Sequence, residues 1–249
     1  MSAVFGSATG AGRALREHDA AVRAPLPLCR RIGFVHLVPG IGGSTLAAQV
    51  ATVLARRRAG MVLAVDASPS PHGLLPLLDV PPGPTAPVRP GTAAEVRAAL
   101  TRAPAGCYTL DLRPAATALR TPSRPAGPAG GLDAASPASP ASPAGGGGGV
   151  GGAAWSAGVG PVARFFDVVV TDWGLRHPAH DLEPVLSTSH AVCLVVRPED
   201  AGAAAALVRT LPPTPPVVLA AAGRRLGPRQ HLRLAAELMR PSRGDRRDR

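Results

Sequence analysis

One continuous stretch, from Ile32 to Asp66, constrains the fold of this 249-residue chain more than any other. It reads IGFVHLVPGIGGSTLAAQVATVLARRRAGMVLAVD: an apolar run, a glycine-rich segment, apolar residues at helical spacing, and a second apolar run that ends on an aspartate. Uninterrupted apolar runs are typical of strands that are buried on both faces of a parallel sheet. The stretch therefore predicts a strand, a helix and a second strand, joined as one βαβ unit with a glycine-rich first turn.

Strand-like and helix-like runs alternate along the rest of the chain. This alternation predicts a single α/β domain with an open, mostly parallel sheet and helices on both faces. Right-handed crossovers would place the loops that follow the strands along one edge of the sheet, where ligands bind. The expected strands cover 32–38, 61–65, 107–112, 166–171, 190–196 and 216–222, and the expected helices cover 44–58, 92–102, 181–186, 200–211 and 228–239.

Composition divides the chain into parts of different character. Residues 1–30 are expected to be a flexible leader, 31–240 the α/β domain, and 241–249 a basic tail. The domain is interrupted at about 113–161 by a Pro/Ala/Gly/Ser-rich segment that includes three Ala-Ser-Pro triplets. Such a segment buries too little apolar surface to offset its conformational entropy, so it is expected to be a disordered insertion.

The net charge is +11, and all 27 basic residues are arginine. An arginine-only composition with scattered basic residues favours genomic base composition as its cause, so nucleic acid is an alternative partner but not the favoured one. The three cysteines, Cys29, Cys107 and Cys193, match no zinc or disulfide pattern. With no signal-peptide core and no apolar run near the roughly 18 residues of a membrane span, a cytoplasmic protein without a transmembrane segment is expected.

Three segments would meet at the ligand-binding edge of the predicted sheet. Glycines between Pro39 and Thr45 let the backbone turn and approach an anion, and amides at the start of the following helix point toward it. Asp66 and Asp172 each follow an apolar strand. A phosphate loop with two carboxylates is the minimum for binding a nucleotide and Mg²⁺. The structural alternatives are a tight turn without ligand, a capping aspartate and a surface carboxylate.

The order of strand, GIGGST, long helix and VLAVDAS resembles the ParA/MinD family of P-loop ATPases, which have a deviant Walker A loop. The later FFDVVVTDWG is similar to the Walker B strand of that family, and the pair VLAVDAS and TDWG is most similar to its actinobacterial type VII secretion-associated group. The resemblance implies a P-loop NTPase-like fold and ATP with Mg²⁺ as cofactors. It covers 32 to about 70 well and 166–222 moderately.

The resemblance assigns roles to individual residues of the loop and the strand ends. It implies that Ser44 and Asp172 hold Mg²⁺ and that Asp66 and Asp172 are catalytic. Gly43 stands at the position of the P-loop lysine, and Val38 at that of the signature lysine. Losing this charge commonly costs several kcal/mol in the transition state, which makes hydrolysis doubtful. The implied nucleotide-binding residues are Gly40, Ile41, Gly42, Gly43, Ser44 and Thr45.

The sequence thus predicts a nucleotide-binding switch or scaffold with a degenerate P-loop. It would position or regulate a secretion or partitioning partner, and a homodimer is a candidate assembly. Two alternatives stay open: a pseudo-ATPase that keeps the fold as an interaction protein without binding nucleotide, and a weak ATPase in which an arginine replaces the missing lysine. The candidate arginines are Arg31, Arg176 and Arg224.

Overall fold

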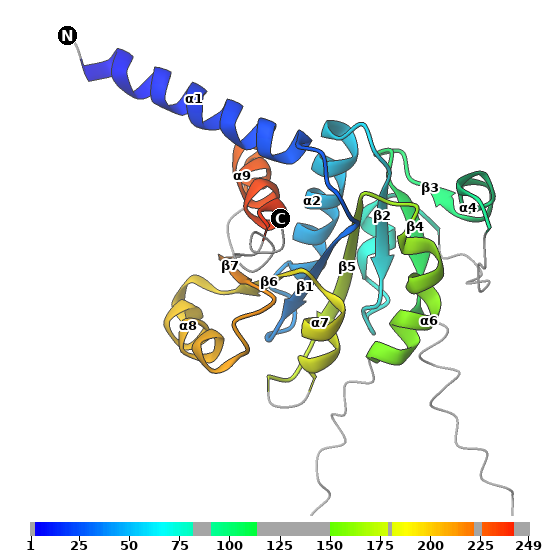
Figure 1. Ribbon diagram of the computed structural model, residues 1–249. Coiled ribbons are helices and arrows are strands. Elements are labelled where there is room, and N and C mark those ends of the chain that lie inside the picture. The colour runs from blue at the N-terminus through cyan, green and yellow to red at the C-terminus, as the bar shows by residue number, and fades with distance from the viewer. Residues whose placement is uncertain (1–2, 82–90, 114–149, 179–180, 222–225, 242–249) are drawn as a thin grey trace, which may run out of the picture.

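The computed structural model describes residues 3–81, 91–113, 150–178, 181–221 and 226–241. In this part of the chain, the strands form one seven-stranded sheet in the order β3-β4-β2-β5-β1-β6-β7 (Figure 1). All neighbouring strands are parallel except β3 and β4, which are antiparallel. The strands are β1 (Arg30–His36), β2 (Val62–Asp66), β3 (Thr101–Arg102), β4 (Tyr108–Asp111), β5 (Val168–Leu175), β6 (Ala191–Val196) and β7 (Val217–Ala221).

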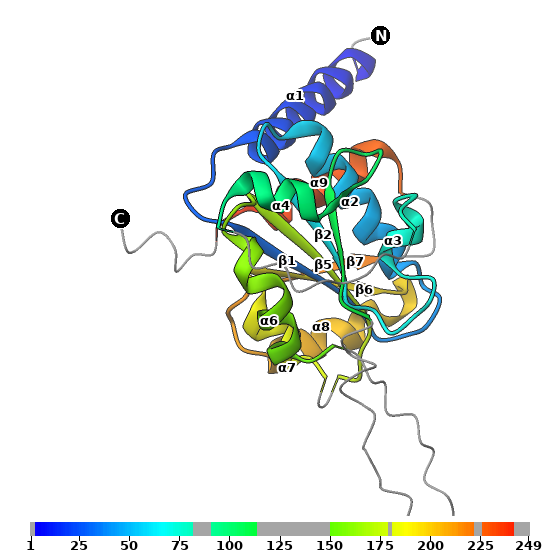
Figure 2. The same cartoon turned by 90° about the vertical axis from the view of Figure 1, so that its right-hand side faces the viewer.

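Helices cover both faces of the sheet, and each face has its own apolar core (Figure 2). On one face lie α1 (Ala3–Arg23), α2 (Gly43–Arg57), α3 (Leu74–Leu77) and α9 (Pro228–Met239). The other core includes residues of α4 (Ala93–Ala99), α6 (Gly152–Ala163), α7 (Glu183–Thr188) and α8 (Ala201–Thr210), the last preceded by the 3₁₀ turn η1 (Pro198–Asp200). The predicted single-domain α/β architecture is confirmed.

The apolar composition of the central strands explains their position. Every residue of β2 and β6 is buried, as an uninterrupted apolar run requires when helices cover both faces of a sheet. In β1, alternate residues point to opposite cores: Ile32 and Phe34 to the α2 side and Val35 to the α6 side. The loop that follows β1 therefore lies at the carboxyl edge, between the ends of β5 and β6.

The predicted disorder at about 113–161 is wrong for its last part, because α6 begins at Gly152. Trp155, Val159 and Val162 recur at helical spacing and are buried in the core of the sheet's second face. The Trp155 indole also donates a hydrogen bond to Thr171 Oγ1 of β5 at 3.0 Å. The burial of one apolar stripe thus stabilises α6 although the sequence around it has low complexity. Residues 114–149 of the predicted insertion lie outside the described residues.

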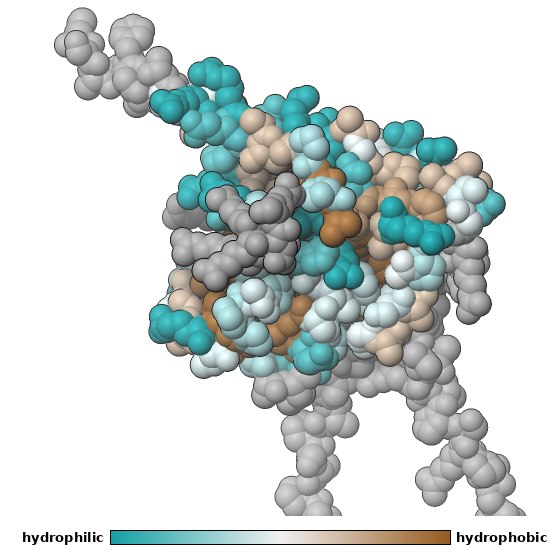
Figure 3. All heavy atoms as spheres, viewed as in Figure 1, coloured by the Kyte–Doolittle hydropathy of each residue, from teal (hydrophilic) through white to brown (hydrophobic). Residues whose placement is uncertain are grey.

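The amino-terminal segment also differs from the expected flexible leader. It forms the 21-residue helix α1, whose carboxyl end packs against α9 and α2 (Figure 1). Val22 is fully buried there, and the buried Arg58 side chain donates to the carbonyl oxygens of Val22 and Ala24. The part of α1 that is drawn in colour outside the body is hydrophilic at its surface (Figure 3). The basic tail lies outside the described residues from 242 onward.

Candidate functional site

The loop between β1 and α2 presents unpaired backbone amides at the carboxyl edge of the sheet. Gly40 and Gly42 have φ angles of +72° and +89°, which side-chain-bearing residues rarely adopt. Gly42 is the N-cap of α2, provides no side-chain cap, and is followed by no acidic residue in the first turn. The amides of the first turn, from Gly43 to Thr45, therefore have no acceptor within the helix and form its positive end.

Three aspartates lie in register on neighbouring strands: Asp66 and Asp111 end β2 and β4, and Asp172 lies within β5. Asp66 of β2 pairs with Asp111 of β4 on one side and with Asp172 of β5 on the other. Asp66 and Asp172 are 0% exposed, and Asp111 is 7% exposed. The sequence predicted Asp66 and Asp172 and missed Asp111, although it too ends an apolar strand-like run, CYTLD.

Asp172 has an unsatisfied carboxylate oxygen. Its Oδ1 accepts the Gly174 amide at 3.0 Å, whereas Oδ2 is buried and has no hydrogen-bond partner in the described structure. Burial raises the pKa of Asp172 to about 6; a hydrogen bond from the Ser44 hydroxyl lowers this pKa and the charge of Asp66 raises it. Ser44, at the start of α2, and Asp172, within β5, are thus brought together.

Asp66 is tied to the loop that follows its own strand. Its Oδ1 accepts the Ser68 amide and its Oδ2 accepts the Leu75 amide, both at 3.2 Å. Gly73 leaves room for the carboxylate, because a Cβ there would lie 2.5 Å from Oδ2. Burial raises the pKa of Asp66, and the Leu75 amide and the Arg113 guanidinium partly offset this shift. These contacts are typical of a carboxylate that holds a loop in shape.

The end of β5 packs directly on the loop after β2. Gly174 has a φ angle of +68°, and a Cβ there would lie 2.4 Å from Ser68 Oγ. The end of β5 and the loop that Asp66 anchors are therefore in close contact. A side chain at position 174 would push them apart, so the glycine of TDWG serves this close approach.

His36 occupies the space that a side chain at position 43 would need. A Cβ on Gly43 would lie 2.3 Å from Nδ1 of His36, closer than real Cβ contacts allow. This Nδ1 is buried and has no hydrogen-bond partner in the described part of the chain. Burial lowers the pKa of His36, which favours the neutral imidazole. The space beside Gly43, the position at which the sequence resemblance would place a lysine, is therefore filled by the His36 ring.

The candidate replacement arginines are engaged elsewhere. Arg31 lies at the amino end of β1, at the opposite edge from the loop, where its Nη2 is 2.9 Å from His190 Nε2. Arg176 is buried near Asp172, and its guanidinium donates to the carbonyl oxygens of Trp173 and Val150 at 3.0 and 3.2 Å. Arg224 lies outside the described residues.

A cation that the sequence did not single out lies beside the aspartates. Arg113 makes two hydrogen bonds to the Asp111 carboxylate, at 2.9 and 2.7 Å, and its Nη1 lies 3.7 Å from Asp66 Oδ2. The guanidinium thus offsets part of the negative charge of Asp111 and Asp66. Its position two residues beyond β4 offered no motif by which it could be recognised.

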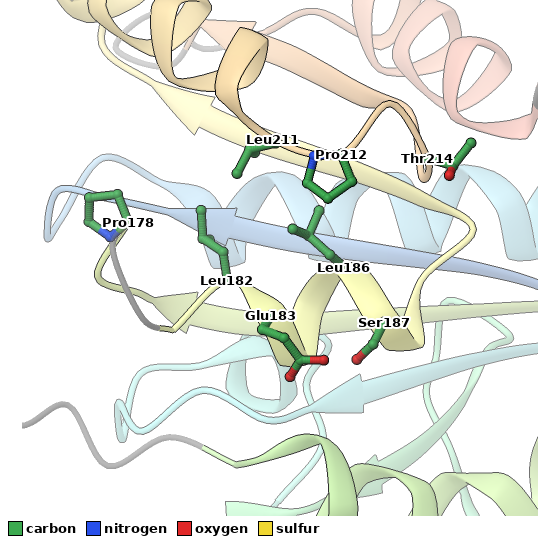
Figure 4. A pocket seen from close by; sticks show the side chains of 8 residues that line it. All are labelled: Pro178, Leu182, Glu183, Leu186, Ser187, Leu211, Pro212 and Thr214. Carbon is green, nitrogen blue, oxygen red and sulfur yellow. The ribbon is translucent and has the colours of Figure 1, made fainter.

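An apolar hollow lies away from these residues. A hollow of about 430 Å³ runs between α7 and the segment before β7, and it includes none of the loop residues or aspartates (Figure 4). Its lining includes Leu182, Leu186, Leu211 and Pro212. Among the described residues, no group of three His, Cys, Asp or Glu side chains is arranged to hold a metal ion. No described helix is long and apolar enough to cross a membrane.

Comparison with protein-family models and with curated proteins found no match for this sequence. Among solved structures, a ParA family ATPase from Chlorobium tepidum TLS is 18% identical with a TM-score of 0.50, covering 86% of this chain and 81% of that one. A plasmid partition protein from Borrelia burgdorferi is 14% identical with a TM-score of 0.49, covering 82% and 83%. Cobyrinic acid a,c-diamide synthase from Mycobacterium smegmatis, solved with ADP and magnesium, is 16% identical with a TM-score of 0.45, covering 84% and 81%. The first likeness shows that the chain has the fold of ParA-like P-loop NTPases.

Proposed function

We propose that this protein is a ParA/MinD-like nucleotide-binding switch that binds a Mg²⁺-nucleotide at the carboxyl edge of its sheet and hydrolyses it slowly or not at all. The observation that carries the proposal is the buried Asp172 Oδ2, which has no partner in the described structure and lies beside the start of α2. A buried carboxylate oxygen without a partner destabilises the ligand-free fold. A bound cation would remove that cost.

The residues at this point fit magnesium. The Ser44 hydroxyl and the Asp172 carboxylate are hard oxygen donors, and Mg²⁺ is commonly held by one or two protein oxygens with water and phosphate oxygens completing its shell. When bound, the ion would supply positive charge to the phosphates. Two protein ligands suffice for such a site.

The phosphates would be held by the backbone of the loop. The two positive-φ glycines, Gly40 and Gly42, shape it, and the amides from Gly43 to Thr45 face the anion at the positive end of α2. Ile41 lies between the glycines and would contribute its amide. This arrangement needs no lysine for binding, although it lacks the charge that a lysine would direct at a transferring phosphate.

Slow hydrolysis follows from the same geometry. Arg31 lies at the opposite edge, and the guanidinium of Arg176 is bonded to two carbonyl oxygens. We therefore favour binding without efficient turnover over the hypothesis of a weak ATPase that is rescued by arginine. Asp66 would act by holding the loop after β2, because both of its oxygens already accept amides.

The partner is proposed to be a protein of a secretion or partitioning system, with the nucleotide state controlling its association. The support is the sequence similarity of VLAVDAS and TDWG to the type VII secretion-associated group. Homodimerisation is the simplest way to couple binding to association. Light scattering with and without Mg-ATP tests this: a nucleotide-dependent increase in mass supports it, and an unchanged monomer contradicts it.

Calorimetric titration with Mg-ADP tests nucleotide binding. The wild type should bind, and Asp172→Asn should reduce the affinity at least tenfold, because a carboxylate that holds the cation is lost. Asp200→Asn is the matched control, since Asp200 lies on η1 and makes no side-chain capping bond to α8. Absence of heat from the wild type at millimolar nucleotide would favour the pseudo-ATPase alternative.

A further inference from the structure

The contact between His36 and Gly43 extends the proposed function. His36 is the last residue of β1, and its backbone is fixed by pairing with both β5 and β6. Its imidazole lies where a side chain on Gly43 would begin: the virtual Cβ would be 2.3 Å from Nδ1, 3.0 Å from Cγ and 3.2 Å from Cε1. The ring therefore fills the starting point of the side chain that P-loop proteins extend toward the phosphates.

We infer that His36 takes the place of the missing P-loop lysine, so that its imidazole is the side chain that hydrogen-bonds the phosphate in this site. The inference rests on the proposed function, because it assumes that a phosphate is bound at the start of α2. It identifies a binding residue that lies outside the glycine-rich loop, seven positions before the residue it replaces.

An unsatisfied polar atom supports this role. Nδ1 of His36 is buried without a hydrogen-bond partner in the described residues, beside helix amides that also lack intrahelical acceptors. A phosphate oxygen at this point would accept hydrogen bonds both from the His36 imidazole and from the first amides of α2. Asp172 Oδ2, another buried atom without a partner among the described residues, lies beside Ser44, the residue next to Gly43.

The chemistry of imidazole suits a site without lysine. Burial lowers the pKa of His36, and the positive end of α2 disfavours a second positive charge, so the ring is neutral without a ligand. A neutral imidazole still has one N–H to donate. It would therefore contribute a hydrogen bond to the phosphate while supplying less charge than lysine, which agrees with binding without efficient turnover.

A ligand-free double-mutant cycle tests the packing on which this depends. Gly43→Ala should lower the melting temperature of the wild type, because the new Cβ meets the ring. In a His36→Ala background, the same Gly43→Ala change should be neutral or stabilising, since alanine is the better helix former. Equal effects in the two backgrounds would show that the ring does not occupy this space, and would overturn the inference.

Calorimetry with Mg-ADP tests the role in binding. His36→Ala should weaken binding about ten- to hundredfold, the usual effect of a hydrogen bond to a charged group. His36→Asn keeps a hydrogen-bond donor and should lose less affinity than His36→Ala. The double variant His36→Ala/Gly43→Lys should recover affinity for Mg-ADP. His18→Ala on α1 is the control and should bind as the wild type does.

The two proposals fail in different ways. If the wild type binds Mg-ADP and His36→Ala binds equally well, the role of His36 is wrong while the proposed function stands. If the wild type itself does not bind, both are overturned. Melting temperatures of the His36 variants distinguish lost contacts from lost folding, because a folded His36→Asn protein with unchanged affinity would also contradict the inference.

Discussion

At the scale of single residues, two of the buried polar atoms that lack a hydrogen-bond partner in the described structure lie where the nucleotide is proposed to bind. Asp172 Oδ2 and His36 Nδ1 are both buried without partners in the described structure, and both lie against the first turn of α2. Elsewhere in the described core, buried charges such as Arg30 and Arg176 are satisfied by carbonyl oxygens. Ligand binding would thus relieve a cost that the free protein bears.

The pKa of Asp172 gives a pH prediction. Its folded-state pKa is about 6, above the ordinary value of 3.8, so between these values the folded state holds more protons than the unfolded state. Stability should therefore fall as the pH rises through this window, by on the order of 2–3 kcal/mol. Asp172→Asn should remove this loss and be more stable than the wild type at pH 7. Urea unfolding at pH 4, 5, 6 and 7 checks it, and parallel curves for the two proteins would contradict it.

Part of the candidate site could be predicted from the sequence because its residues lie next to recognisable strand ends. Gly40, Gly42, Asp66 and Asp172 follow apolar runs, and the expected topology brings those ends to one edge. Asp111 and its partner Arg113 were missed, since nothing local marks which strands become neighbours in register. The contact between His36 and Gly43 was missed for another reason. It depends on the orientation of the His36 side chain across the loop between β1 and α2.

At the scale of elements, α6 shows how composition can mislead. The surrounding sequence is rich in Pro, Ala, Gly and Ser, and α6 itself contains Pro161. The helix forms because one stripe of apolar side chains is buried against β5 and its neighbours. Trp155 also stacks on Trp173, with ring centroids 6.5 Å apart, which ties the helix to the strand that carries Asp172. Tertiary packing here outweighs local propensity.

Trp155→Ala measures the contribution of α6. The substitution removes a buried indole and leaves Thr171 Oγ1 without its donor, so we expect a loss of about 3–5 kcal/mol in the free energy of unfolding. Ser156→Ala, at the next and exposed position, should change stability by less than about 0.5 kcal/mol. Chemical denaturation measures both. An unchanged free energy of unfolding for Trp155→Ala would contradict the burial of α6 and support the prediction that this segment is disordered.

The docking of α1 depends on Arg58 at the end of α2. Its guanidinium donates to the carbonyl oxygens of Val22 and Ala24 and lies 3.3 Å from Asp167 Oδ2. Arg58→Ala should therefore cost about 1–3 kcal/mol and speed amide hydrogen exchange in α1.

Arg57→Ala is the comparison for this prediction. Arg57 is exposed and pairs with Asp19, an arrangement that contributes little to stability. Its loss should change the free energy of unfolding by less than about 1 kcal/mol. Equal effects of the two substitutions would show that α1 is not held through Arg58.

At the scale of the whole molecule, the fold is the part that periodicity predicts best. Alternating apolar strands and amphipathic helices led to a parallel sheet covered on both faces, and the likeness to a ParA family ATPase supports the same architecture. The order of the strands could not be predicted from the sequence, because a right-handed crossover does not determine which two strands become neighbours in the sheet. This order places β1 between β5 and β6, and so puts Ser44 against Asp172.

A crystal structure with Mg-ADP would test whether nucleotide binds at the carboxyl edge of the sheet. We expect phosphate oxygens about 3 Å from the amides of Gly42 to Thr45, the distance of hydrogen bonds. We also expect Mg²⁺ on Ser44 Oγ, with Asp172 Oδ2 bound to the ion directly or through water, and the imidazole of His36 turned to the phosphate. A nucleotide bound elsewhere, or a ligand at this edge that leaves Asp172 Oδ2 without a partner, would contradict this expectation.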